Sequence, residues 1–142
     1  MGYRIYQIDR EWRKSLGEDW RKHDLSYIEF SSRGNLADRW KPEYLDHYKH
    51  VVSLNAEGFG GDSETDLWKV YHTFNMHSFV VSGEDIYENV ISDYETKTVE
   101  RDGEKITYKM YHSLSIGDIV EDLETGKKFI LHDDFVDLQE IN

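Results

Sequence analysis

Cysteine is absent from this sequence of 142 residues, and proline occurs only at Pro42. Without cysteine there is no disulfide, no cysteine-ligated zinc site and no thiol nucleophile. No apolar run approaches the roughly 18 residues that a membrane-spanning helix needs. The opening residues 1–9 also lack the apolar core of a secretory signal. We therefore expect a cytoplasmic protein with no membrane partner.

Basic residues are scarce relative to acidic ones, 17 against 29, which gives a net charge of −12. Residues 1–50 hold nine acids and ten bases, whereas residues 51–142 hold twenty acids and seven bases. A surface of that sign repels phosphate backbones, so we expect no direct binding to nucleic acid. It attracts basic protein surfaces instead, many of which are nucleic-acid-binding clefts. Simple solubility is the alternative explanation of the same charge.

The length, with 38% hydrophobic and 14% aromatic residues, suits a single domain, residues 1–142, around one core. Ten tyrosines and four tryptophans are many for this length. Their large apolar bodies with polar tips serve either in a core or as anchors at a protein interface.

The first part of the chain predicts a strand followed by a helix. Residues 3–8 alternate and are rich in β-forming residues, which is typical of a strand. Asp9 can cap a following helix, in which Trp12, Leu16 and Trp20 recur every four residues.

Three more elements follow before residue 76. A short strand is predicted over 25–30. A helix is predicted over 41–52, because Pro42 suits the first turn of a helix. Another helix is predicted over 63–75, where Ser63 begins a capping box.

The last third of the sequence predicts strands. The Asp102-Gly103 turn joins strands over 94–99 and 106–111. Further strands are predicted over 119–123, 128–132 and 135–138, with Thr125-Gly126 closing a second hairpin. The fold class predicted is α+β: an N-terminal strand and two or three helices packed on a C-terminal antiparallel sheet.

Patterns that suggest chemistry are present but incomplete. The glycines of residues 58–61 precede a predicted helix, as in phosphate-binding loops, but four acids and no base surround them. Glu43, His47 and His50 would share one helix face, yet solvated side chains are the simpler interpretation. His112 and Ser113 are adjacent in a predicted strand, so they point to opposite faces. We predict no catalytic residue, metal ligand or cofactor, and hence no enzyme.

Residues 111–120, YHSLSIGDIV, are the most distinctive stretch. They resemble the HSLSVGDVV signature of YodL-like domains, which occur in proteins of phages, plasmids and integrative elements. Residues 3–8, 66–75 and 125–138 are similar to further segments of these domains, so the resemblance covers roughly half of the chain. Such domains have a short link between helix and signature, whereas here residues 76–110 form an inserted acidic segment.

The resemblance implies an accessory protein of a mobile element in a bacterial host cell, a class that includes antirestriction and anti-CRISPR factors. Joined to the charge, it predicts a protein that binds and inhibits a host defence nuclease by acidic DNA mimicry. The predicted contacts are acids: Glu84, Asp85, Glu88, Asp93, Glu95, Glu100, Asp102, Glu104, Glu121, Asp122 and Glu124.

Two other hypotheses remain open. The first is a general interaction or regulatory module that binds through tyrosine and tryptophan. The second is a hydrolase of a nucleotide signal. Salt separates mimicry from the aromatic module, because exposed charges are screened over about 8 Å at physiological ionic strength. The sequence predicts neither the target nor the oligomeric state.

Overall fold

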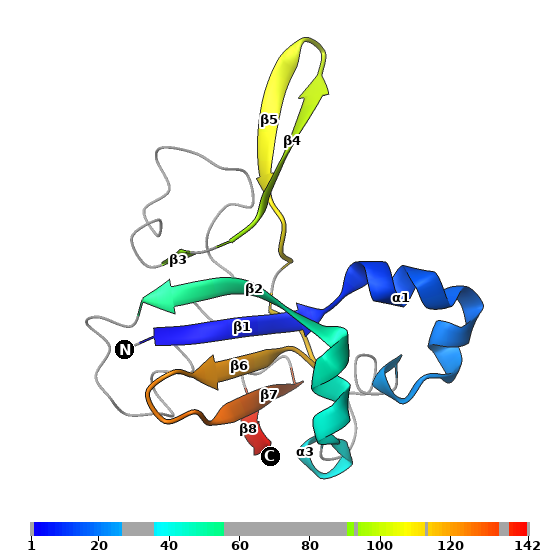
Figure 1. The fold of residues 1–142 in the computed structure, drawn as a ribbon, viewed down its shortest axis with the longest axis vertical. Helices are drawn as coiled ribbons and strands as arrows, with labels where there is room; N and C mark the ends of the chain where they lie inside the picture. Colours follow the sequence, from blue (N-terminus) through cyan, green and yellow to red (C-terminus); the bar gives the residue numbers. More distant parts are fainter. Residues whose placement is uncertain are drawn as a thin grey trace.

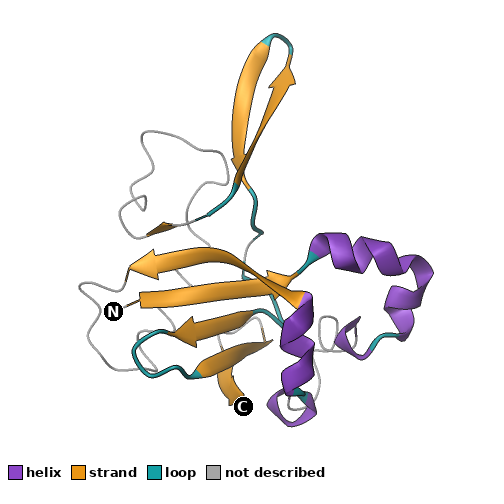
Figure 2. Ribbon diagram, in the orientation of Figure 1, coloured by secondary structure: helices purple, strands orange, loops and turns teal. Residues whose placement is uncertain are grey.

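The computed structural model describes residues 2–26, 36–55, 91–92, 94–112, 114–133 and 137–141. It shows the predicted α+β class, in which helices lie beside antiparallel strands (Figures 1 and 2). The elements of the first part are β1 (Gly2–Ile8), α1 (Arg10–Leu16), the 3₁₀ helix η1 (Gly17–Lys22), α3 (Leu36–Arg39), the 3₁₀ helix η2 (Pro42–His47) and β2 (Tyr48–Asn55). The later elements are β3 (Ile91–Ser92), β4 (Thr96–Arg101), β5 (Glu104–Lys109), β6 (Ile119–Asp122), β7 (Lys128–Asp133) and β8 (Asp137–Ile141).

A six-stranded antiparallel sheet in the order β3-β2-β1-β6-β7-β8 organises the described residues. The predicted N-terminal strand is therefore confirmed, and it lies inside the sheet. Ile5 is opposite Val52 on one side and Val120 on the other. All three side chains are fully buried, so the alternation in β1 reflects its interior position.

The helix predicted over 41–52 is wrong in its second half. Pro42 does begin a helix, but this 3₁₀ helix ends at His47 and β2 follows directly. Two features of this segment in the folded protein suit a strand. Buried residues alternate at Tyr48, Val52 and Leu54, and the β-branched pair Val51-Val52 suits a sheet. Pairing with β1 also satisfies the backbone polar groups of β2.

The helix predicted after Asp9 is confirmed, with a change of type partway along. The Asp9 carboxylate accepts the Glu11 N–H at 2.9 Å and so caps α1. Gly17, at φ 56°, ends the α-helix, and the chain continues as η1 with Trp20 buried. The strand predicted over 25–30 is wrong at its start, because residues 24–26 are helical, and its remainder lies outside the described residues.

Both predicted hairpins are confirmed. Asp102 at φ 52° and Gly103 at φ 80° form the tight turn between β4 and β5. This pair is a separate two-stranded sheet that projects from the main sheet (Figure 1). Gly126, at φ 75°, lies in the turn between β6 and β7. The predicted last strand corresponds to β8, although residues 134–136 lie outside the described residues. The helix predicted over 63–75 and the glycine-rich loop also lie outside them.

Two hydrophobic clusters cover the sheet. Adjacent residues of β6 and of β7 belong to different clusters, which places one cluster on each face. The first cluster consists of Tyr3, Ile5, Val52, Leu54, Tyr111, Leu114, Val120 and Leu131. The second consists of Trp20, Leu25, Tyr44, Tyr48, Ile119, Ile130 and Ile141, against which Trp12 and Leu16 of α1 pack. No helix within the described residues has the length and apolar character needed to span a membrane.

Candidate functional site

The acids predicted to contact a partner fall into three groups. Glu84, Asp85, Glu88 and Asp93 lie outside the described residues. A second group lies on and beside the β4–β5 hairpin, and a third lies on β6 and its following turn. Bases accompany the acids of the second and third groups, so neither group is uniformly acidic.

The hairpin carries balanced charge. Residues 94–112 contain four acids, Glu95, Glu100, Asp102 and Glu104, and also four bases, Lys97, Arg101, Lys105 and Lys109. Glu100 is opposite Lys105, and Glu104 is opposite Arg101, so opposite charges face each other across the strands. At the base of the hairpin, Glu95 accepts a hydrogen bond from Lys49 at 2.9 Å. This bond raises the pKa of Lys49.

The acids of β6 have local structural partners. Glu121 accepts a hydrogen bond from the Tyr6 hydroxyl at 2.9 Å and lies 3.5 Å from the Lys128 ammonium. Burial, and then this bond, raise the pKa of Tyr6. Asp122 accepts the backbone N–H of Glu124 at 2.9 Å, which stabilises the turn. Of Glu121, Asp122 and Glu124, only Glu124 is exposed, and the other two are partly buried.

The acid excess comes from two stretches of the sequence: residues 113–142, with eight acids and two lysines, and the sequence between β2 and β4. Residues 56–93 contain eight acids and one lysine. That segment leaves the sheet at Asn55, opposite Gly2, and the chain pairs with β2 again at Ile91, opposite Leu54. The β6–β7 turn lies at the same end, because the Leu123 N–H donates to the Gly2 carbonyl.

The opposite end of the sheet holds a polar cluster of two buried residues, Gln7 and Asp118, with the partly buried His112. Gln7 and Asp118 are 2% and 4% exposed. The Gln7 amide donates to the His112 carbonyl at 2.8 Å and to Asp118 Oδ2 at 3.0 Å. Gln7 Oε1 accepts the His112 N–H at 3.2 Å, and His112 Nδ1 lies 3.9 Å from Asp118 Oδ2. Buried polar groups with this many partners fix the backbone around them.

The same cluster explains the distinctive stretch at 111–120. Asp118 Oδ2 also accepts the Ser115 N–H at 2.8 Å, which closes the turn before β6. Gly117 adopts φ 91°, a conformation that favours glycine, and its carbonyl accepts the Tyr48 hydroxyl at 2.6 Å. Sequence reasoning identified the Gly117-Asp118 turn but missed Gln7. The sequence did contain a signal for this role, because Gln7 is a polar residue at a position of the alternating strand where the side chain points into the core.

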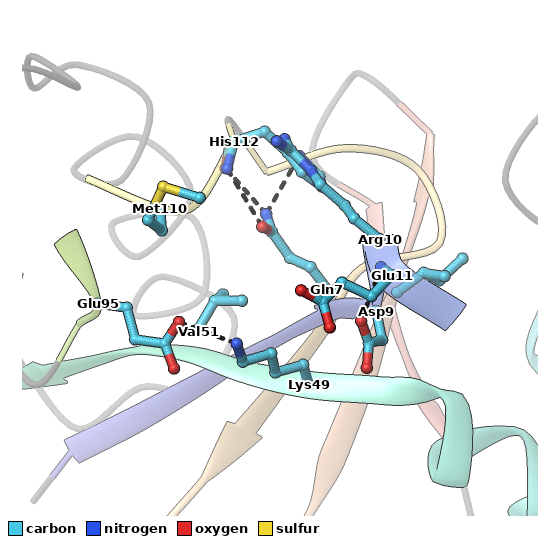
Figure 3. A pocket seen from close by; sticks show the side chains of 10 residues that line it. Gln7, Asp9, Arg10, Glu11, Lys49, Val51, Glu95, Met110 and His112 are labelled. Carbon is cyan, nitrogen blue, oxygen red and sulfur yellow. Dashed lines mark hydrogen bonds and ion pairs between the residues drawn. The ribbon is translucent and has the colours of Figure 1, made fainter. Parts of the chain in front are cut away.

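Three clefts meet around Arg10, at the end of the sheet where α1 begins. Figure 3 shows the first, in which Arg10 extends toward His112 while Lys49 and Glu95 pair on the other side. The second cleft, of about 320 Å³, lies between α1 and the 112–118 segment. The third, of about 440 Å³, follows α1 to Trp20. These concave, charged surfaces can bind a polar ligand.

The suggested trio Glu43, His47 and His50 does not share a helix face. His47 ends η2 and stacks on Trp12, with ring centroids 3.9 Å apart. His50 lies in β2, 3.0 Å from the Ser53 hydroxyl. Within the described residues, no group of three histidine, aspartate or glutamate side chains is placed to hold a metal ion.

Comparisons with protein-family models, with curated proteins and with solved structures give no match to this chain.

Proposed function

We propose that this chain is an accessory protein of mobile genetic elements that docks on a partner protein with a basic nucleic-acid-binding surface. The partner class is a host defence nuclease, a restriction or CRISPR enzyme, which docking inhibits in the host cytoplasm. The observation that carries the proposal is the uneven charge: residues 56–93 hold eight acids against one lysine, whereas the rest of the chain holds 21 acids against 16 bases. The resemblance of residues 111–120 to YodL-like domains supports the cellular context.

The distribution of charge indicates which of the predicted acids should contribute most to partner binding. Carboxylates that already face cations, such as Glu100 and Glu104, gain less from a basic partner than carboxylates in an acid-rich segment. We therefore assign the main electrostatic contacts to Glu84, Asp85, Glu88 and Asp93. The acids of the hairpin and of β6 are secondary contacts. A partner that binds DNA phosphates would recognise such a segment as a phosphate mimic.

The competing aromatic module receives less support. Within the described residues, the exposed large hydrophobic side chains are Met110 and Leu123. Tyr3, Trp20, Tyr44, Tyr48 and Tyr111 are buried in the two clusters. These aromatic residues are therefore core residues and are not interface anchors.

A cleavage assay tests the proposal. Purified restriction endonucleases and CRISPR effectors are incubated with the full chain, and cleavage of a DNA duplex is followed from about 50 to about 300 mM salt. We expect one of these enzymes to be inhibited, with inhibition relieved by non-cleavable competing DNA and weakened by salt. Inhibition that is indifferent to salt would support the aromatic module instead. Absence of inhibition across both enzyme classes would contradict the proposal.

A further inference from the structure

Two adjoining clefts beside α1 share the same two arginines. One is the second of the three clefts described above, lined by Arg10 and Arg13 on α1, by His112, Ser115 and Asp118 on the facing segment, and by two isoleucines. The other is the third cleft, which continues from these arginines to Lys14 and Trp20. Because Arg10 and Arg13 line both, the clefts meet at these two residues.

The shared surface is cationic although the chain as a whole is acidic. Asp118 is the one carboxylate among the described residues that line these two clefts. Its Oδ2 already accepts from Gln7 and from Ser115, at 3.0 and 2.8 Å. No described carboxylate forms an ion pair with Arg10 or Lys14. The positive charges of Arg10 and Lys14 are therefore available to an anion.

The walls of the clefts are held in place. Gln7, on β1, bonds both the carbonyl and the N–H of His112, so the segment that faces α1 is fixed to the sheet. On the other wall, the Arg13 guanidinium lies 4.8 Å from the Trp20 ring centroid, a cation–π arrangement. Preorganised donors lose less freedom when a ligand binds.

We propose that this surface binds a phosphate-bearing small molecule, of the size of a pyrophosphate or a nucleotide. Guanidinium groups match phosphate oxygens with paired hydrogen bonds. Arg10 and Arg13 supply these bonds, Lys14 adds charge, and Ser115 and His112 add polar groups on the facing wall. The cleft volumes suit a ligand of this size. The site is independent of the docking function, because it lies at the opposite end of the sheet from the attachment points of residues 56–93.

Amide NMR of the full chain tests this site. Pyrophosphate and AMP are titrated separately, with the Ser115 and Asp118 amides and the Trp20 indole N–H as reporters. We expect saturable shifts with both probes. The double variant Arg10→Gln/Arg13→Gln should weaken binding by roughly tenfold or more, because it removes both guanidinium groups. Arg10→Gln alone, at an exposed position, should weaken it in part.

The matched control is Arg21→Gln/Lys22→Gln, which removes the same charge from exposed positions outside the clefts. We expect it to bind both probes as the parent does. Three results would overturn the proposal: equal weakening by the control, shifts that do not saturate, or shifts caused only by oligonucleotides of increasing length. The last would indicate a nucleic-acid surface. If the NMR titration fails, the proposed nuclease inhibition is not contradicted. If no nuclease is inhibited, the proposed phosphate site is not contradicted.

Discussion

The β4–β5 hairpin and the Gln7–His112–Asp118 cluster are both rich in polar residues, but they use them in opposite ways. On the hairpin, the charged side chains other than the buried Lys109 are exposed, and opposite charges face each other in the pairs Glu100–Lys105 and Arg101–Glu104. In the cluster, polar groups are buried and joined by hydrogen bonds between residues more than 100 positions apart in sequence. Replacing an exposed charge on the hairpin should change the free energy of unfolding little. Leaving a buried polar group without a hydrogen-bond partner lowers that free energy much more.

Replacement of Asp118 should have the largest effect on stability. Asp118→Ala removes the carboxylate that accepts from the Ser115 N–H and from the Gln7 amide, which keeps only its bond to the His112 carbonyl. We expect the free energy of unfolding to fall by about 2 to 4 kcal/mol, measured by urea denaturation. Asp118→Asn is the control, since an amide oxygen can still accept both bonds, and it should cost about 1 kcal/mol. Equal losses for both variants would contradict this role.

Gln7→Leu should have the next largest effect. Leucine keeps approximately the shape but removes both bonds to the His112 backbone. We expect a loss of about 2 kcal/mol in urea denaturation. The amides of residues 112–118 should also exchange faster with solvent, because Gln7 ties that segment to β1. A variant as stable as the parent would show that the cluster does not fix this segment.

Tyr44 gives a smaller, pH-dependent effect. Its hydroxyl donates to Asp24 at 3.0 Å, and burial, followed by this bond, raises its pKa from 10.0 to about 12. Below pH 10 the neutral hydroxyl should make the parent about 1 kcal/mol more stable than Tyr44→Phe. The unfolded chain loses this proton near pH 10 and the folded chain only near pH 12, so the advantage should disappear between these values. Thermal unfolding of both proteins at pH 8, 10 and 11.5 measures the difference, and a constant difference would refute the assignment.

The smallest effect is expected on the hairpin. Glu100→Gln leaves Lys105 facing a neutral side chain, but both positions are exposed. The melting temperature should stay within about 2 °C of the parent. A larger fall would mean that the cross-strand charges contribute to folding, and the contrast with the buried cluster would then be weaker.

Local signals in the sequence predicted much of this fold. Asp102-Gly103 and Thr125-Gly126 identify their hairpins because few residues adopt the backbone angles that such turns need. The alternation of residues 3–8 identified β1. The interpretation of residues 48–52 failed because tyrosine and valine at mixed spacing fit both a helix face and a strand, and only pairing with β1 decides between them.

The two candidate sites differ in how much the sequence could predict. Acid-rich stretches are visible in composition alone, but the bases that face Glu100 and Glu104 depend on the register of β4 and β5. The cationic clefts were missed because Arg10 and Ser115 are distant in sequence. They meet only where β1 and β6 lie side by side, with α1 at their end.

Two matched triple variants test the central claim most directly. Glu84, Asp85 and Glu88 are replaced by lysine in one protein, and Glu100, Asp102 and Glu104 in the other, so that both change the net charge equally. Affinity for an inhibited nuclease is then measured at constant salt. We predict that the first variant abolishes binding, whereas the second weakens it modestly and both remain folded. Equal affinities for the two variants, or retained inhibition by the first, would contradict the account.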